Sequence, residues 1–231
     1  AVFGVRHVDE RGRLGGAGTL AVPDHQLQGA DPDVGLTAAQ RGRGERELGR
    51  GVDGRLLGQA VCTRHRRVRI GAHTDTLWNL ARWERCPEIG GAWPITKTET
   101  TAANASGGLV YIESPLDCRI PTFSVQIKGA VEAPRFILGE TDPAAWRNTI
   151  RNLPAPWGEL ESSKCVITLP AASLRQVEDP VELVKFWDTV MDRFADLAGR
   201  PYERHRAERY VPDVQISAGY MHSGYPLMTG T

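Results

Sequence analysis

The side chains best suited to chemistry gather near the end of the chain, in residues 219–226. Two glycines and a proline there interleave with two tyrosines and a histidine. A backbone with unusual turns that carries large, partly polar side chains is typical of loops that line sites. Tyr220, His222 and Tyr225 are therefore candidate site residues. The alternative is an aromatic-stapled turn in which His222 is satisfied in the core.

Two other pairs of polar residues have a spacing that could serve chemistry. His73 and Asp75 could be metal ligands, or a base and the group that orients it. No third ligand lies nearby in sequence, so we interpret them as a capping turn that opens a helix with an apolar face of Leu77, Trp78, Leu80 and Ala81. Asp188 and Asp192 lie one helical turn apart and could bind a cation, but a solvated helix face explains them as well.

The elements that must position these residues are mostly short strands. Apolar runs or clean alternation predict strands near residues 68–70, 109–112, 122–131, 135–138 and 164–170, and an exposed strand near 96–101. Alternation of Val214, Ile216 and Ala218 with polar residues predicts a last strand, with Pro212 just before it. The acidic stretch 156–161 and the charged stretch 202–209 are predicted to be loops.

Two helices are signalled by an aspartate followed by proline. Asp142-Pro143 predicts a helix to about Asn152, and Asp179-Pro180 opens the longest one. Its apolar positions follow the helical period, and Gly199 ends it. Those positions are Leu183, Val184, Trp187, Val190, Met191, Phe194 and Leu197. Together the elements predict an α+β chain: a β-rich, sandwich-like part over 68–140, then helices and strands over 141–231.

Composition excludes several function classes. Lys+Arg and Asp+Glu are both 28 in 231 residues, and this zero net charge argues against a nucleic-acid binder or a binder of anionic membranes. There is no apolar run of 18 residues, so we expect no direct membrane insertion. The cysteines Cys62, Cys86, Cys118 and Cys165 form no Cys-x-x-Cys pair, which is evidence against a zinc ribbon or a dense disulfide framework.

Residues 1–67 differ from the rest of the chain. They are rich in arginine and glycine, and 13 of the 25 glycines fall in the first 60 positions. Large apolar groups are few, so the segment cannot offset its own ordering entropy. We interpret it as a disordered leader, or as sequence translated in a wrong frame. An Arg/Gly-rich RNA-binding tail is disfavoured, because acidic residues are mixed in and no aromatic residue accompanies the Arg/Gly-rich stretch from Arg41 to stack on bases.

The amino-acid sequences of several later stretches resemble one protein family. The stretches 70–77, 85–89, 107–112, 156–170 and above all 213–228 are similar, in the family's order, to enhancin-like zinc metallopeptidases. That family includes viral enhancins, mucin-degrading proteases and TRP-channel-associated factors. The resemblance covers about residues 68–228 and implies the front of a zincin-like peptidase domain. The wording after Tyr225-Pro226 departs from the family at residues 229–231.

The resemblance also implies what to expect of activity. The family's His-Glu-x-x-His helix does not occur among these 231 residues. A catalytic zinc needs about three protein ligands and an open position for water. We therefore expect zinc in the full-length family but no cofactor, metal ligand or catalytic residue in this chain, which would be an inactive front part of a peptidase acting on glycoproteins or mucins. By analogy with zinc proteases, residues 214–220 would be a substrate-binding edge, and Tyr220, His222 and Tyr225 would line the cleft.

A rival hypothesis comes from the same resemblance. TRP-channel-associated factors share this domain, so the chain could instead belong to a regulatory or glycan-binding protein whose partner is a membrane channel. A hydrolase that uses His73 and Asp75 on its own is a third, weaker hypothesis.

Overall fold

The computed structural model describes residues 66–97, 99–113, 124–204 and 206–231. It also describes the backbone of three strands nearer the N-terminus: β1 (Phe3–Arg6), β2 (Thr19–Val22) and β3 (Gly35–Ala39). The prediction of a disordered or non-native leader over 1–67 falls mostly outside the described residues and stays a prediction. Cys62 and Cys118 also lie outside the described residues.

The first half of the described chain forms two antiparallel sheets. One has the order β5-β4-β7-β2-β9, with β4 (Arg67–Ile70), β5 (Gly91–Pro94), β7 (Gly108–Glu113) and β9 (Val131–Ala133). The other has the order β1-β8-β3-β6, with β6 (Glu99–Thr101) and β8 (Ser124–Ile127). Val68, Ile70 and Val110 from the first sheet share a core with Val125 and Ile127 from the second. The predicted sandwich-like part is thus confirmed.

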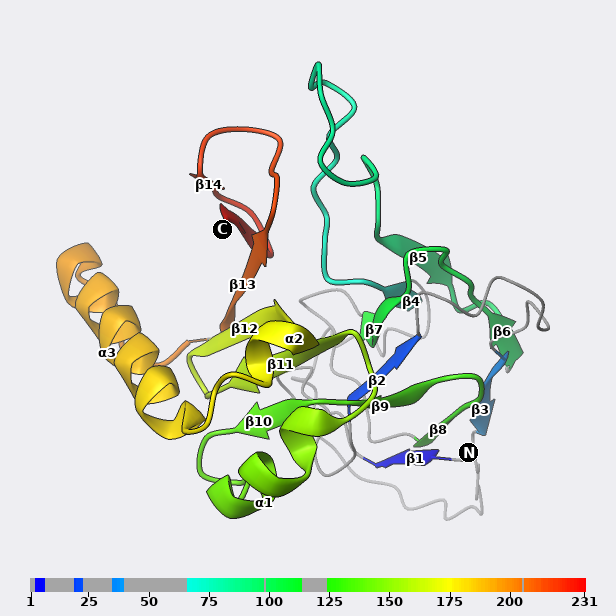
Figure 1. Cartoon of the computed structure of the whole chain (residues 1–231), viewed down its shortest axis with the longest axis horizontal. Coiled ribbons are helices and arrows are strands. Elements are labelled where there is room, and N and C mark those ends of the chain that lie inside the picture. The colour runs from blue at the N-terminus through cyan, green and yellow to red at the C-terminus, as the bar shows by residue number, and fades with distance from the viewer. Residues whose placement is uncertain are drawn as a thin grey trace, which may run out of the picture.

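The second half builds one mixed sheet of six strands (Figure 1). Its order is β10 (Arg135–Ile137), β11 (Trp157–Glu161), β12 (Cys165–Pro170), β13 (Glu208–Asp213), β15 (Leu227–Gly230) and β14 (Met221–His222). β11 pairs antiparallel with β12, and β14 with β15, while the other neighbours are parallel. β14 therefore lies at one edge of this sheet.

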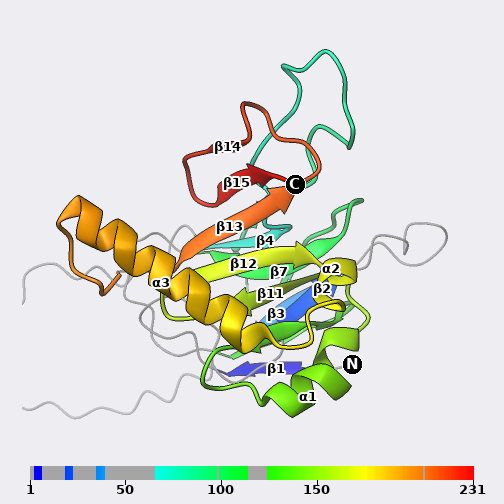
Figure 2. The same cartoon turned by 60° about the vertical axis from the view of Figure 1, so that its left-hand side comes forward.

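The helices begin and end largely as their capping residues predict. Asp142 caps α1 (Pro143–Asn148) by accepting hydrogen bonds from two backbone N–H groups. α1 stops four residues earlier than expected and is followed by a 3₁₀ turn, η1 (Ile150–Asn152). A short helix, α2 (Ala171–Leu174), follows β12. α3 (Pro180–Ala198) is capped by Asp179 and ends at Gly199, whose φ of 60° suits glycine. It lies across one face of the six-stranded sheet (Figure 2). The predicted α+β class is confirmed.

The predicted last strand over 214–218 is wrong. The strand is β13, which ends at Asp213 and includes Pro212. Pairing with β12 ends at Tyr210, so the missing N–H of Pro212 breaks no ladder there. Beyond Asp213 the backbone N–H of Ser217 donates to the carboxylate of Asp75 instead of to a neighbouring strand. The charged loop expected over 202–209 therefore ends where β13 begins at Glu208.

Two further local predictions are wrong for related reasons. No helix follows Asp75, because its carboxylate is taken by Ser217 and the N–H of Leu77 donates to the carbonyl of Pro87, 3.0 Å away. The acidic stretch 156–161 is not a loop but holds β11. Acidic side chains in an interior strand require buried positive partners, and both glutamates of β11 have one.

The partner of Glu159 is Arg209, at the middle of the six-stranded sheet. Tyr111 on β7 and Thr168 on β12 donate hydrogen bonds to Glu159 Oε1 at 2.8 and 3.0 Å. The guanidinium of Arg209 on β13 contacts the same oxygen and lies 4.9 Å from the Tyr111 ring centre. Arg135 pairs similarly with Glu161 at 2.5 Å. The buried network of Tyr111, Glu159, Thr168 and Arg209 thus joins the six-stranded sheet to the N-terminal sheets.

The contacts within this network determine the protonation states of Glu159 and Tyr111. Burial alone would raise the pKa of Glu159, but the charges of Arg209 and Arg135 hold that pKa below its ordinary value. Burial and the negative charge of Glu159 raise the pKa of Tyr111 well above its ordinary value. Glu159 therefore stays ionised and Tyr111 stays a neutral hydrogen-bond donor at physiological pH.

Removing one member of the ion pair should destabilise the fold strongly. Arg209→Met leaves the Glu159 carboxylate buried without its countercharge, and we expect the free energy of unfolding to fall by about 3–5 kcal/mol. Adding Glu159→Gln to Arg209→Met should recover a substantial part of the loss. Tyr111→Phe should cost only about 1 kcal/mol. Urea denaturation of the four proteins measures these changes, and equal stability of the single and double variants would contradict the assignment.

Candidate functional site

Two loops that are far apart in sequence lie side by side at one end of the molecule (Figures 1 and 2). The first is residues 71–90 between β4 and β5, and the second is residues 214–220 between β13 and β14. We refer to them as the junction loops. Gln215 bridges them: its side-chain amide donates to the carbonyl of Arg82 at 2.9 Å, and its oxygen accepts from the N–H of Glu84 at 2.8 Å.

A buried carboxylate, Asp213, lies at the base of the junction loops. Nε of Arg85 donates to its Oδ2 at 2.6 Å. Nε2 of His73 lies 3.4 Å from the same oxygen. The two atoms form no hydrogen bond, because this nitrogen has no hydrogen-bond partner among the residues that the structure describes. Arg85 is therefore the residue that balances the charge of Asp213.

His73 itself is kept neutral. It is only 4% exposed, and its ring meets that of Trp157 edge to face with 4.8 Å between centroids. Burial lowers the pKa of His73 to about 4; the charge of Arg85 lowers it too, while Asp213 opposes the shift. His73 is therefore a neutral imidazole packed on an indole at physiological pH.

The second histidine pair closes the junction from the other side. Nε2 of His222 lies 3.2 Å from Oδ2 of Asp75, and the N–H of Ser217 donates to the same oxygen at 2.6 Å. Burial raises the pKa of Asp75, but the hydrogen bond from Ser217 and the nearby His222 outweigh it and leave the pKa below its ordinary value. Asp75 is thus an ionised anchor for residues 217–222.

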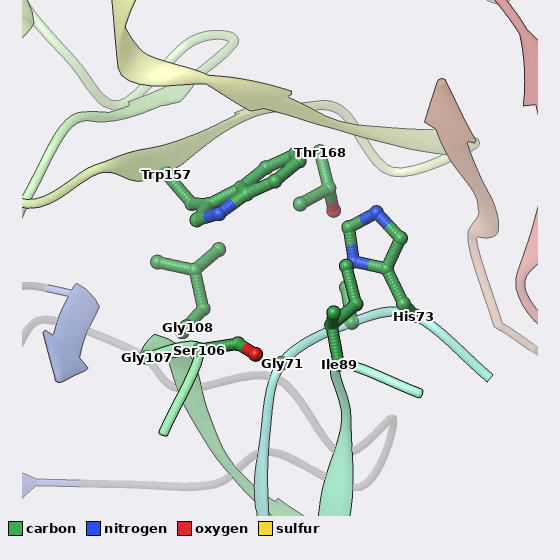
Figure 3. Close-up of a pocket in the computed structure, with 10 residues that line it drawn as sticks. Gly71, His73, Ile89, Ser106, Gly107, Gly108, Trp157 and Thr168 are labelled. Atoms are coloured by element: carbon green, nitrogen blue, oxygen red, sulfur yellow. The ribbon is translucent and has the colours of Figure 1, made fainter. Parts of the chain in front are cut away.

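A small pocket opens beside this cluster. It is lined by His73, Trp157 and Thr168 on one side and by three glycines, Gly71, Gly107 and Gly108, on the other (Figure 3). The space within it is about 10 Å³, which is room for about one water molecule. The glycines permit close packing: a Cβ at Gly108, whose φ is 130°, would lie 2.7 Å from the backbone of Gly71. The pocket is therefore too small for a substrate side chain or sugar.

The sequence-predicted site residues have different fates. The sequence suggested that His73 and Asp75 could act together as a pair. In the structure, His73 lies beside Asp213 and Asp75 accepts a hydrogen bond from Ser217, about 140 positions later in the chain. Tyr220 is 79% exposed at the junction, and His222 pairs with Asp75. Tyr225 points elsewhere: its hydroxyl lies 3.3 Å from the Ala207 carbonyl, and the Arg206 guanidinium stacks 3.4 Å over its ring. Their role in lining a cleft stays a prediction.

Sequence reasoning missed the two residues at the centre of the cluster, Arg85 and Asp213. Both lie in stretches that resemble the family, which was the available signal. Asp188 and Asp192, the other carboxylate pair, do not form a cation site. Asp188 accepts from the hydroxyl of Ser162, and Asp192 pairs with Lys164 Nζ at 2.6 Å.

The donor set of the junction does not suit a catalytic zinc. Within the described ranges, no group of three or more His, Cys, Asp or Glu side chains is placed to hold a metal ion. The guanidinium of Arg85 lies on Asp213, the carboxylate nearest His73, and a cation there would meet that positive charge.

Comparison with known proteins agrees with this two-part architecture. The model of Peptidase M60, enhancin and enhancin-like, matches residues 129–231. The model of the N-terminal domain of M60-like peptidases matches residues 57–128. The chain belongs to the enhancin-like M60 peptidase family.

Curated relatives of this M60 chain are channel-associated factors. It is 44% identical over 172 residues to TRPM8 channel-associated factor 2 of Bos taurus, which covers 74% of this chain and 19% of the relative. It is 39% identical over 161 residues to the TRPM8 channel-associated factor homolog of Danio rerio, covering 70% and 18%. The chain thus spans about a fifth of the length of these relatives.

Several solved structures with the same fold are metallopeptidases. The catalytic module of the metalloprotease ZmpA from Clostridium perfringens superposes with a TM-score of 0.57 at 13% identity, over 91% of this chain and 42% of that one. The IMPa metallopeptidase from Pseudomonas aeruginosa gives 0.56 at 11% identity, over 100% and 28%. At such identities the likeness shows the fold alone. Among the described helices, none has the length and hydropathy to span a bilayer.

Acidification should weaken the junction through His73. A histidine whose folded pKa is about 4 binds fewer protons in the folded than in the unfolded chain between pH 4 and its ordinary 6.5. The free energy of unfolding should therefore rise with pH through that window. The slope attributable to His73 is at most about 1.4 kcal/mol per pH unit. Urea denaturation between pH 5 and 6.5 measures this slope, because most carboxyl groups titrate below that pH range.

Two variants isolate the cause. His73→Gln removes the titrating group and should flatten the slope in this window. Gln215→Ala removes a non-titrating tie between the same loops, so it should lower stability while leaving the slope unchanged. A His73→Gln variant with the parental slope would assign the pH dependence to another group.

Proposed function

We propose that this chain supplies a non-catalytic wall of a ligand cleft in an M60-family protein, and that these 231 residues do not hydrolyse peptide bonds by themselves. One observation carries the proposal: both carboxylates at the junction are already committed to holding its loops together. Asp213 is balanced by Arg85, and Asp75 anchors Ser217 and His222.

The chemistry of hydrolysis explains why this matters. A zinc peptidase activates water on a metal held by about three ligands, next to a base with an available lone pair. His73 is buried and packed on Trp157, and Arg85 occupies the carboxylate that would otherwise assist it. The His-Glu-x-x-His motif is absent from the 231 residues. Zinc would therefore be held elsewhere in a complete family member.

The ligand surface in this proposal is the β14 edge with the loop before it. An exposed strand edge binds an extended peptide through main-chain hydrogen bonds. Tyr220 beside that edge is largely exposed, and an exposed tyrosine offers an apolar ring and a hydroxyl. Tyr220 and His222 suit one wall of a cleft for a glycoprotein or mucin ligand. Tyr225 would support the loop, because its ring is covered by Arg206.

A second candidate function is regulation of a membrane channel without proteolysis. It is favoured by the 44% identity to TRPM8 channel-associated factor 2, since the metallopeptidase structures are only 9–13% identical. Under this hypothesis the junction surface would contact a channel or its associated proteins instead of a substrate. Both candidates use the chain for binding, and they differ in the partner.

The test of inactivity uses the purified 231-residue chain. After incubation with excess ZnCl2 and desalting, we expect well under 0.2 zinc per chain by mass spectrometry, and no cleavage of casein or mucin above the buffer control. Stoichiometric zinc together with cleavage abolished by His73→Ala would refute the proposal and support the hydrolase that uses His73 and Asp75.

A binding assay separates the two candidate partners. Tyr220→Ala should weaken binding at the junction several-fold, whereas Leu197→Ala, exposed on α3, should not. Loss of binding to a mucin glycopeptide favours the cleft; loss of co-precipitation with TRPM8 favours channel regulation. No effect of Tyr220→Ala on either ligand would remove the β14 edge from the proposal.

A further inference from the structure

The turn that leads into β7 carries a modification motif. Asn104-Ala105-Ser106 is an Asn-x-Ser sequon, and no other Asn-x-Ser or Asn-x-Thr sequence occurs among the 231 residues. In such a sequon the side-chain nitrogen of the asparagine, Nδ2, accepts an N-linked oligosaccharide, and the motif is typical of surface loops. The contacts of Asn104 decide whether that nitrogen is available.

The side chain of Asn104 is fully engaged in the folded chain. Its Nδ2 donates to the carbonyl oxygens of Ile89 and Gly107, both at 2.9 Å, and lies 3.4 Å from the carbonyl oxygen of Ile70. An amide nitrogen carries two hydrogens, so the two shorter bonds use both of them. On the other side Oδ1 accepts from the N–H of Ser106 at 3.2 Å. The side chain therefore has no free hydrogen on Nδ2.

These hydrogen bonds close the base of the first junction loop. Ile70 is the last residue of β4, and Ile89 lies two residues before β5. Asn104 thus joins the two ends of the loop from a third segment, the turn before β7. The same loop carries Asp75 and Arg85, which hold the second junction loop. Asn104 is therefore a positioning residue for the junction.

A glycan on Nδ2 does not fit this arrangement. Glycosylation replaces one Nδ2 hydrogen of Asn104 by the anomeric carbon of a sugar. With an N–C bond of about 1.5 Å, that carbon would lie only about 1.4 Å from a carbonyl oxygen that is now 2.9 Å from Nδ2. Non-bonded carbon and oxygen atoms keep about 3.3 Å or more between them. Either hydrogen meets the same obstacle, because both point at backbone oxygens.

We propose that Asn104 accepts an N-linked oligosaccharide only in the unfolded chain, so that a glycan at Asn104 and a closed base of the first junction loop exclude each other. The donor is a lipid-linked oligosaccharyl diphosphate. Nδ2 forms a bond to the anomeric carbon, the bond from that carbon to the diphosphate oxygen breaks and its electron pair leaves with the diphosphate, and one Nδ2 hydrogen leaves as a proton. Modification before folding leaves the junction open, whereas folding first protects Asn104. This inference does not depend on which ligand the junction binds.

An acceptor assay with solubilised oligosaccharyltransferase and its lipid-linked donor tests the proposal. A peptide of residues 99–110 should gain a mass that peptide N-glycosidase removes, and the folded chain should be modified at least a hundredfold more slowly. The matched control is the folded Ser106→Ala/Ala81→Thr chain, which moves the sequon to the exposed Asn79 and should be modified readily. A folded parental chain modified as fast as the peptide, or a peptide that gains no glycan, would overturn the proposal.

Trypsin digestion tests the closed loop base separately. Asn104→Asp places a carboxylate oxygen against backbone carbonyls, so cleavage after Arg82 in the first junction loop should become at least tenfold faster relative to cleavage after Arg193 on α3. Ser106→Ala, which keeps Nδ2, and Asn148→Asp, which is exposed on α1, should be cleaved at the parental rate. An Asn104→Asp chain with the parental ratio of cleavage at the two sites would remove Asn104 from the loop base and overturn the proposal.

Discussion

The buried ion pair between Glu159 and Arg209 is the constraint on which the rest of this structure depends. A carboxylate in the middle of a sheet is tolerated only with a countercharge and satisfied lone pairs. Arg209, Tyr111 and Thr168 meet that need from β13, β7 and β12. Because Tyr111 belongs to a different sheet, the need of the Glu159 carboxylate for hydrogen-bond donors and a countercharge aligns the two halves of the fold. The register of β13 against β12 follows from the same contact.

Strand periodicity carries this constraint to the candidate site. Side chains two and four positions apart point to the same face of a strand. Arg209, Val211 and Asp213 thus share the face of β13 that meets the N-terminal sheets, while Tyr210 faces α3 and contacts Met191. Because Glu159 fixes the position of Arg209, Asp213 on the same face of β13 lies beside Arg85 and His73. On β11 the same rule places Trp157 against His73 and Glu159 against Tyr111. The junction is therefore an extension of the core.

Local signals were sufficient for much of the fold and insufficient for the site. Alternation at Val125 and Ile127 and the Asp-Pro caps at 142 and 179 depend only on neighbouring residues, and the structure confirms them. β11 was missed because Glu159 and Glu161 resemble solvated residues until Arg209 and Arg135 are known to face them. The strand expected at 214–218 was wrong because Asp75, about 140 positions away, takes the N–H of Ser217. Contacts at such separations leave no periodic trace in one sequence.

α3 shows what the helical period reveals and what it conceals. The sequence predicts one apolar face that includes Val184, Phe194 and Leu197, and the structure divides that face in two. Each residue turns the helix by about 100°. Viewed down the helix axis, the apolar side chains form an arc that has Phe186 at one edge and Ala195 at the other, and this arc covers roughly half the circumference. Packing on one core needs an arc of only about 100°. Part of the arc meets the sheet, and the remainder faces solvent in the described fold. The apolar arc of α3 is thus wider than the part that the described sheet covers.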